Sequence, residues 1–332
     1  MDFTNTIAAN ARLLSTTFGP DHMQAAVIAR PVFRIEDGQL ALAPDVEWPI
    51  DTMPSQTAYG AFPGDVPFLT GGIDLFVFGS AWQAEGQPGA RLTMEIRVGE
   101  TLRRRIAVIG NRYWAGQGNG LAPSDPEPFI DMPLIYANAY GGSVETEQGL
   151  ANWPANPNGK GFYLTADQAA GGPLPNLEDP DHLIGTFEDH PDPIATGPYP
   201  ADGSLRALNA LDLDFTPGKF GIRRIKPTMF NHAHPAMILP PGTAEPGCIV
   251  EITHATPAGT LRFALPALSL EAHVELEDRA YDFPLHIDQI GVLAMERRVF
   301  LSYRTVFKYR LVRRERRRTT LRLKPSAEQT NA

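Results

Sequence analysis

Alternating apolar and polar residues predict β-strands near the start of the chain. In VFRIEDGQLAL the apolar residues alternate on both sides of Asp37-Gly38. Asp-Gly is a favoured two-residue hairpin turn, because glycine tolerates a positive φ. Closing the hairpin there sets Ile35 opposite Leu40 and Phe33 opposite Leu42. Turn chemistry and hydrophobic pattern therefore predict the same register.

A second hairpin is predicted in RLTMEIRVGETLRRRIAVIG. A two-residue turn would set apolar residues against arginines. A three-residue turn, Gly99–Thr101, instead pairs Val98 with Leu102 and Met94 with Ile106, so this register is preferred. It also places Glu95 opposite Arg105.

Further strands are predicted at Ile73–Phe78, in CIVEITHA and TLRFALPAL, and in the long C-terminal block. That block alternates from Val299 to Leu311, with side chains on two faces. A turn near Glu296–Arg298 would pair it with QIGVLAM. A long segment without this pattern separates the strands predicted before residue 116 from those predicted after residue 247.

The interruption covers residues 116–247 and shows no periodicity. It contains 19 of the 31 prolines and many spread-out aromatic residues. A structureless loop of this length is unusual inside a compact domain, and the aromatic content argues against disorder. The segment is therefore expected to be ordered, irregular chain packed on the sheets, with single helical turns at LTADQAAGG and LEDPDHLIG.

Together these patterns predict a mainly β fold of two packed antiparallel sheets, sandwich-like, with a proline-rich irregular central segment and few short helices. The predicted unit is a single β-rich domain over residues 1–324. It comprises N-terminal hairpins (10–115), the irregular insertion (116–247) and C-terminal strands (248–324). Residues 325–332 are expected to be a disordered tail.

The charge distribution is uneven along the chain. The segment from Arg297 to Lys324 carries 12 of the 29 basic residues and one of the 38 acidic residues, which leaves 17 basic and 37 acidic residues elsewhere. One interpretation is internal, with the basic strands lying against the acidic body. The other is a patch for nucleic acid or an acidic partner. Basic residues that alternate with apolar ones favour the first.

Few features of the sequence indicate the cellular compartment of the protein. Cys248 is the only cysteine, so an intrachain disulfide is excluded, which fits a reducing cytoplasm. MDFTNTIAANARLL lacks the pattern of a secretory signal peptide, and no apolar run is long enough to span a membrane. The expected location is cytoplasmic, without membrane contact.

The sequence contains only weak candidates for a metal-binding or catalytic site. His232 and His234 in NHAHP could ligate zinc, but no further ligand stands at a metal-motif spacing. The carboxylates of LPNLEDPDHLI lack a calcium-loop spacing, and Asp beside Pro commonly forms turns. No catalytic residue, metal or cofactor is therefore predicted, and the chain is not expected to be an enzyme.

Five blocks in order carry a family resemblance: GNRYW, SDPEPFIDMPLIYANAYGG, NPNGKGF, LPNLEDPDHLI and MFNHAHP. They resemble the family called domain of unknown function 2169, over roughly Asn10 to Arg310. Members of this family are linked to type VI secretion and look like cytosolic adaptors or chaperones that help to load an effector toxin onto a VgrG-type spike. The resemblance implies no catalytic residues.

The expected activity is therefore protein binding, with the effector toxin or the spike protein as partner. The residues expected at the partner-binding surface come from the family blocks: Glu127, Phe129, Tyr136, Tyr140, Asn176, Glu178 and Asp179. The alternative is a hydrolase on a β scaffold, which requires carboxylates such as Glu127 and Glu178 to converge in one cleft. Nucleic-acid binding through Arg313–Arg318 is the least favoured, because the rest of the chain is acidic.

Overall fold

The computed structural model describes residues 1–17, 19–117, 120–201, 210–214, 221–276, 279–311 and 317–324. The fold is mainly β, as the alternation predicts. Helix α1, Ala166–Ala169, has Thr165 as its N-cap, which accepts the N–H of Gln168. The short 3-10 helices are η1 (Ala84–Gly86), η2 (Tyr136–Asn138), η3 (Pro227–Phe230) and η4 (Pro235–Met237).

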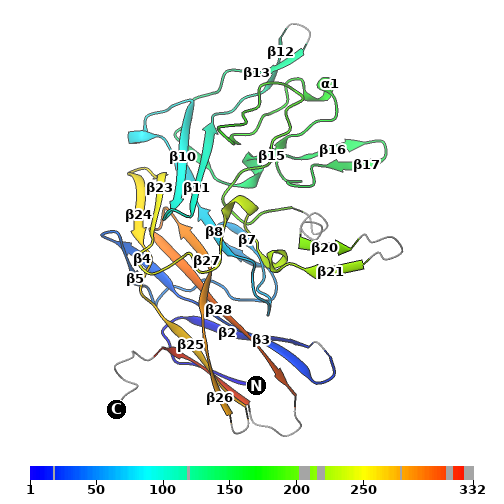
Figure 1. Cartoon of the computed structure of the whole chain (residues 1–332). Helices are drawn as coiled ribbons and strands as arrows, with labels where there is room; N and C mark the ends of the chain where they lie inside the picture. Colours follow the sequence, from blue (N-terminus) through cyan, green and yellow to red (C-terminus); the bar gives the residue numbers. More distant parts are fainter. Residues whose placement is uncertain are drawn as a thin grey trace.

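The largest sheet has eight strands and runs through the middle of the molecule (Figure 1). Its main order is β2-β3-β28-β27-β8-β22, and β4 pairs with both β28 and β5. The strands are β2 (Asn10–Thr17), β3 (His22–Arg30), β4 (Val32–Glu36), β5 (Gln39–Leu42), β8 (Ile73–Phe78), β22 (Ile238–Leu239), β27 (His286–Leu293) and β28 (Arg298–Arg310). β27 and β8 are parallel, whereas its other strand pairs are antiparallel.

Two smaller sheets complete the framework. The five-stranded sheet has the order β19 (Leu177–Glu178), β11 (Leu102–Ile109), β10 (Arg91–Val98), β23 (Ile249–Thr256), β24 (Gly259–Ala264). The four-stranded sheet has the order β1 (Asp2–Asn5), β29 (Arg317–Leu323), β25 (Leu270–Leu276), β26 (Arg279–Pro284). In Figure 1 the four-stranded sheet and the N-terminus lie at the lower end, and the green central segment lies at the upper end.

The predicted registers are confirmed. In β4–β5, Ile35 faces Leu40 and Phe33 faces Leu42, and the turn residues Asp37 and Gly38 have positive φ. β10 and β11 pair as the three-residue turn requires, with Val98 opposite Leu102 and Met94 opposite Ile106. The C-terminal hairpin pairs Leu293 of β27 with Arg298 of β28, so the turn falls where it was expected.

The side-chain ion pairs of β10–β11 differ from the backbone register. Glu95 faces Arg105 across the ladder, but its carboxylate accepts hydrogen bonds from Arg103 at 2.8 and 2.9 Å. Arg105 reaches instead to Asp181 in the central segment, at 2.7 Å. The long arginine side chains thus find partners beyond their direct cross-strand neighbours.

The central segment is ordered and irregular over most of its described length, and short β-ribbons punctuate it. The ribbons are β12 (Trp114–Gln117) with β13 (Gly120–Pro123), β14 (Asp131–Pro133) with β9 (Ser80–Trp82), β15 (Tyr140–Gly141) with β18 (Lys160–Gly161), β16 (Ser143–Thr146) with β17 (Gly149–Asn152), and β20 (Leu211–Asp214) with β21 (Gly221–Ile225). A further ribbon, β6 (Ser55–Thr57) with β7 (Gly60–Phe62), precedes the segment. Helix α1 forms within LTADQAAGG, whereas LEDPDHLIG forms β19 followed by a turn.

Two apolar clusters form most of the core, and a third, small one joins Ala26, Ile28 and Ile50. The large one joins buried side chains of all three sheets, such as Phe300, Phe263 and Leu321. Trp48 stacks on Phe300 at 4.7 Å between ring centroids and closes one side of this cluster. The smaller cluster lies within the central segment, where Trp114, Tyr140 and other rings pack together. The aromatic residues therefore anchor the irregular chain, as their distribution predicts.

A buried charge cluster ties the loop before β8 to the eight-stranded sheet. Asp65 accepts hydrogen bonds from Arg30 at 2.7 Å and from Arg304 at 3.2 Å. Arg304 also donates to Asp288 at 2.5 Å. All four side chains are buried. Both arginines in addition donate to backbone carbonyl oxygens of the loop, including that of Val66.

The basic C-terminal strands are largely neutralised by acids from other parts of the chain. Arg310 pairs with Asp21 at 2.8 Å, and Arg322 pairs with Glu271 at 2.8 Å. Arg304 is held in the buried cluster described above. These contacts support the internal interpretation of the basic stretch. Arg313, Arg314 and Arg316, like the predicted tail at 325–332, lie outside the described residues.

The buried charge cluster predicts a large effect of removing its shared acid. We expect Asp65→Ala to lower the free energy of unfolding by about 3 to 5 kcal/mol, because Arg30 would lose its buried counter-charge and Arg304 would lose one of its two. Denaturant unfolding followed by tryptophan fluorescence measures this change. The matched control is Asp45→Ala, which removes an ion pair with Arg34 at the surface and should leave the midpoint almost unchanged. Equal shifts for the two variants would contradict the prediction.

Candidate functional site

The family blocks meet at a buried polar cluster beside β11 and β19. We call it the polar node, and its members are Arg112, Asn138, Asn156, Lys160, Asn176 and Glu178. Asn176 donates to the carbonyl oxygen of Ile109 at 2.8 Å and accepts from the Lys160 ammonium at 2.5 Å. Asn156 donates to the carbonyl oxygens of Tyr136 and Tyr140, at 2.8 and 3.0 Å. The node therefore joins four of the five blocks.

The charged pair of the node is fully committed to internal contacts. Arg112 donates to Glu178 and, at 3.0 Å, to the carbonyl oxygen of Pro175. The other carboxylate oxygen of Glu178 accepts the N–H of Ile184 at 2.9 Å. Burial raises the pKa of Glu178, and the nearby Arg112 opposes that shift. Burial also lowers the pKa of Lys160. This arrangement holds irregular chain together.

The MFNHAHP block wraps around a buried carboxylate of β8. Asp74 accepts hydrogen bonds from Asn231 Nδ2 at 2.9 Å, from the N–H of His232 at 2.9 Å and from the N–H of Ala233 at 3.1 Å. Asn231 also accepts the N–H of Gly71 and so ties the block to the start of the strand. Burial raises the pKa of Asp74 to about 6, although these bonds favour the ionised form.

The histidines of this block have structural contacts. His234 Nδ1 accepts the N–H of Ala236 at 3.1 Å and caps η4, and its ring packs on Tyr199. Burial lowers the pKa of His234 to about 4, so the imidazole is neutral near pH 7. Within the described ranges no three His, Cys, Asp or Glu side chains are grouped so that they could hold a metal ion.

An uncharged hollow of about 550 Å³ lies beside η2 and the end of β8. We call it the apolar hollow. Its lining includes Tyr59, Phe78, Leu134, Ile135, Tyr136 and Pro198, and none of the described side chains that line it carries a charge. Ile135 is 49% exposed, whereas its neighbours Leu134 and Tyr136 are buried. The apolar hollow therefore presents the apolar side chain of Ile135 to solvent.

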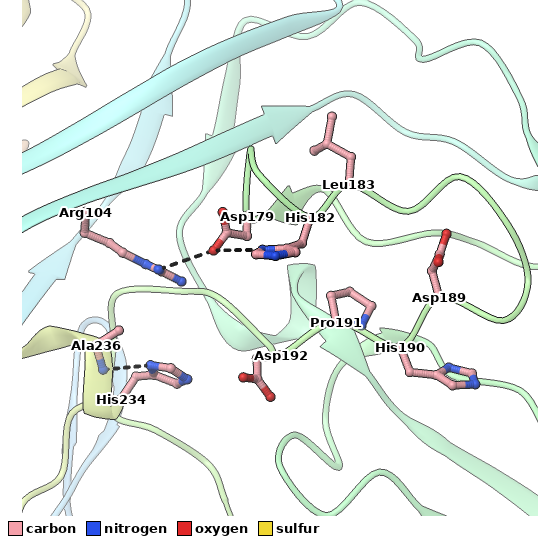
Figure 2. Close-up of a pocket in the computed structure, with 10 residues that line it drawn as sticks. All are labelled: Arg104, Asp179, His182, Leu183, Asp189, His190, Pro191, Asp192, His234 and Ala236. Atoms are coloured by element: carbon pink, nitrogen blue, oxygen red, sulfur yellow. Dashed lines mark hydrogen bonds and ion pairs between the residues drawn. The ribbon is translucent and has the colours of Figure 1, made fainter.

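A charged hollow of about 590 Å³ lies near β11, and Figure 2 shows the residues that line it. Arg104, Asp179 and His182 form a row, with 3.4 Å between Arg104 Nη1 and Asp179 Oδ2. Asp189 accepts the N–H groups of Gly185 and Thr186, which lowers its pKa. The carboxylate of Asp192 points toward His234 in Figure 2.

The predicted partner-binding residues differ in how deeply the structure buries their side chains. Tyr136, Tyr140, Asn176 and Glu178 are buried, Phe129 and Asp179 are half-buried, and Glu127 is exposed. The buried four belong to the core and the polar node, and Tyr136 also lines the apolar hollow. Sequence reasoning missed Ile135, Arg104 and Asp192. The alternation of Leu134, Ile135 and Tyr136 was a signal for the first, but it is too short to stand out.

The hydrolase alternative requires Glu127 and Glu178 in one cleft. Glu127 lies at the surface and accepts a hydrogen bond from Asn111 at 3.3 Å. Glu178 is buried and both of its oxygens are already bonded, to Arg112 and Ile184. No observation therefore favours catalysis by this pair, and the alternative stays an untested hypothesis.

Comparison with protein-family models places the chain in a defined family. Residues 21–304 match the model described as "Uncharacterized protein conserved in bacteria (DUF2169)". Because this match covers most of the chain, the protein belongs to that family. No curated protein and no solved structure matches the chain significantly. No helix in the described ranges has the length and apolar character needed to cross a membrane.

The Asp74 site predicts a pH-dependent contribution to stability. The folded pKa, about 6, lies above the ordinary value for Asp, so the folded chain binds this proton more tightly than the unfolded chain. The stability that Asp74 contributes therefore increases as the pH falls through 6. Asp74→Asn cannot titrate and should lose this gain. The difference in free energy of unfolding between wild type and Asp74→Asn should grow by about 1.4 kcal/mol from pH 7.5 to pH 5.

Denaturant melts at the two pH values give this difference directly. Asp45→Asn is the control, because the pKa of Asp45 is lowered by its hydrogen bond with Arg34 and lies below this range. A difference for Asp74→Asn that stays constant with pH would count against the raised pKa.

Proposed function

We propose that this protein is a cytoplasmic, non-catalytic adaptor or chaperone. It binds a type VI secretion effector and assists its loading onto a VgrG-type spike. The proposal takes its partners from the resemblance of the five sequence blocks, and membership of the DUF2169 family is consistent with it. The apolar hollow is the structural observation that supports protein binding.

The apolar hollow has the character of a protein-binding surface. Its lining is aromatic, aliphatic and proline-rich, and it lies at the LIYA part of the longest family block. Aromatic and apolar side chains in desolvated pockets supply much of the binding energy at protein interfaces. The exposed Ile135 at its lining gives a partner a side chain to bury.

Hydrogen bonds also hold the chain around the apolar hollow in place. Leu134 donates its N–H to the carbonyl oxygen of Gly79, and Thr196 donates to those of Val77 and Leu134. The wall is therefore bonded to β8 and to the short strand that follows it. A surface held in this way loses little conformational freedom when a partner binds.

Co-expression with the neighbouring secretion genes followed by affinity pull-down tests the proposal. We expect one effector to co-purify in a stable, stoichiometric complex. Ile135→Glu places a charge in the apolar hollow and should reduce recovery of the effector about tenfold. Leu150→Glu is the control, because Leu150 is similarly exposed on β17 but does not line the hollow. A chain that co-purifies with none of the secretion proteins would refute the adaptor function.

A further inference from the structure

Three hollows lie in a row, and the first boundary is the segment 233–236. His234 and Ala236 line the charged hollow, whereas Ala233 and Pro235 line a middle hollow of about 580 Å³. Alternate residues thus face opposite sides where the chain enters η4. The segment is a narrow wall between two neighbouring hollows.

The segment 197–201 forms the second boundary in the same way. Gly197, Pro198 and Pro200 line the apolar hollow, and Tyr199 and Ala201 line the middle hollow. The order along the surface is therefore charged hollow, middle hollow, apolar hollow. Each wall is one chain thick.

The two walls are bonded to each other. The N–H of Tyr199 donates to the carbonyl oxygen of His232 at 2.8 Å, and the Tyr199 ring lies 4.8 Å from the His234 ring. On its other side the same ring lies 5.6 Å from Tyr136, which lines the apolar hollow. The carboxylate of Asp74 accepts a hydrogen bond from the N–H of Ala233 in the first wall. The row is thus one connected, supported surface.

The chemistry changes along the row. The charged hollow has one arginine, Arg104, and three aspartates. Arg104 pairs with Asp179, and Asp189 accepts two backbone N–H groups. Asp192 is exposed, and no hydrogen bond or ion pair joins it to another residue of the described ranges. Among the residues that the structure describes, the middle hollow is lined by one charged residue, Lys226, and the apolar hollow by none.

We propose that the three hollows form one groove for an extended segment of the effector. The segment is apolar over the middle and apolar hollows, and it carries a Lys or Arg that meets Asp192 at the charged end. This inference rests on the proposed adaptor function and names what the adaptor recognises. The surplus of acid in the chain outside residues 297–324 also favours a basic ligand.

The test uses the full chain and synthetic peptides, 15 residues long by design, that tile the effector recovered in the pull-down. Fluorescence anisotropy should identify a bound peptide with a Lys or Arg at one end of an apolar run. Asp192→Lys should weaken its binding about tenfold. Replacing the basic residue of the peptide by Glu should restore binding to Asp192→Lys and weaken binding to the wild type. This exchange of charges is not expected from a merely structural effect.

The control is Glu147→Lys, the same charge reversal in the exposed turn between β16 and β17, which should leave peptide binding unchanged. If the effector co-purifies but no peptide binds, or if Asp192→Lys binds as the wild type does, the groove is wrong and the adaptor function stands. If no effector co-purifies, both fall. If sedimentation shows a dimer that Ile135→Glu dissociates, a second copy occupies the hollow and the inference is overturned.

Discussion

Irregular chain rich in proline has more backbone acceptors than donors, because proline has a carbonyl oxygen but no N–H. Buried carbonyl groups nevertheless need hydrogen-bond partners. In this protein polar side chains supply the missing donors. Arg30 donates to the carbonyl oxygen of Pro49, Gln24 to that of Pro67, and Arg112 to that of Pro175. Asn138 does the same for Pro133 at 2.9 Å. Burial of the irregular segments depends on these hydrogen bonds from side-chain donors to backbone carbonyl oxygens.

This constraint explains why charged and amide groups are buried so deeply. Arg30 is completely buried, yet its guanidinium meets a carboxylate, an amide, a hydroxyl and a carbonyl oxygen. Asn156 is completely buried and donates to two carbonyl oxygens of another family block, those of Tyr136 and Tyr140. A group of this kind is costly to bury alone, and hydrogen bonds from most of its polar atoms offset that cost. The family blocks are therefore sequences in which turn geometry and side-chain donors have to agree.

Gly141 shows the same agreement at backbone level. It has a φ of 144°, and a Cβ added there would lie 2.1 Å from the carbonyl oxygen of Asn156. Only glycine combines this backbone conformation with so close an approach. The AYGG end of the block and the NPNG turn are thus required together, although they are separated along the chain.

The sequence predicted local structure well and long-range structure poorly. The register of β4–β5 follows from Asp37-Gly38 and the alternation around it, all within one short window. The burial of Tyr140 depends instead on Trp153 and His190, which no periodicity connects to it. The same holds for Asp65, whose arginine partners come from β3 and β28. Pairing of distant irregular segments leaves no local pattern, so the polar node and the hollows could not be located before the fold was known.

Rigidity of the walls has a consequence for recognition. Each boundary of the groove is one chain thick, and such a wall would collapse or shift if only apolar contacts held it. Bonds from Asp74 and Asn231 on one side, and from Thr196 on the other, fasten the walls to β8. A preformed groove reduces the ordering cost of binding, which for an unfolded effector segment falls mainly on the ligand. Buried polar side chains thus fasten the walls of the proposed groove, in the same way that they bond irregular chain elsewhere in the molecule.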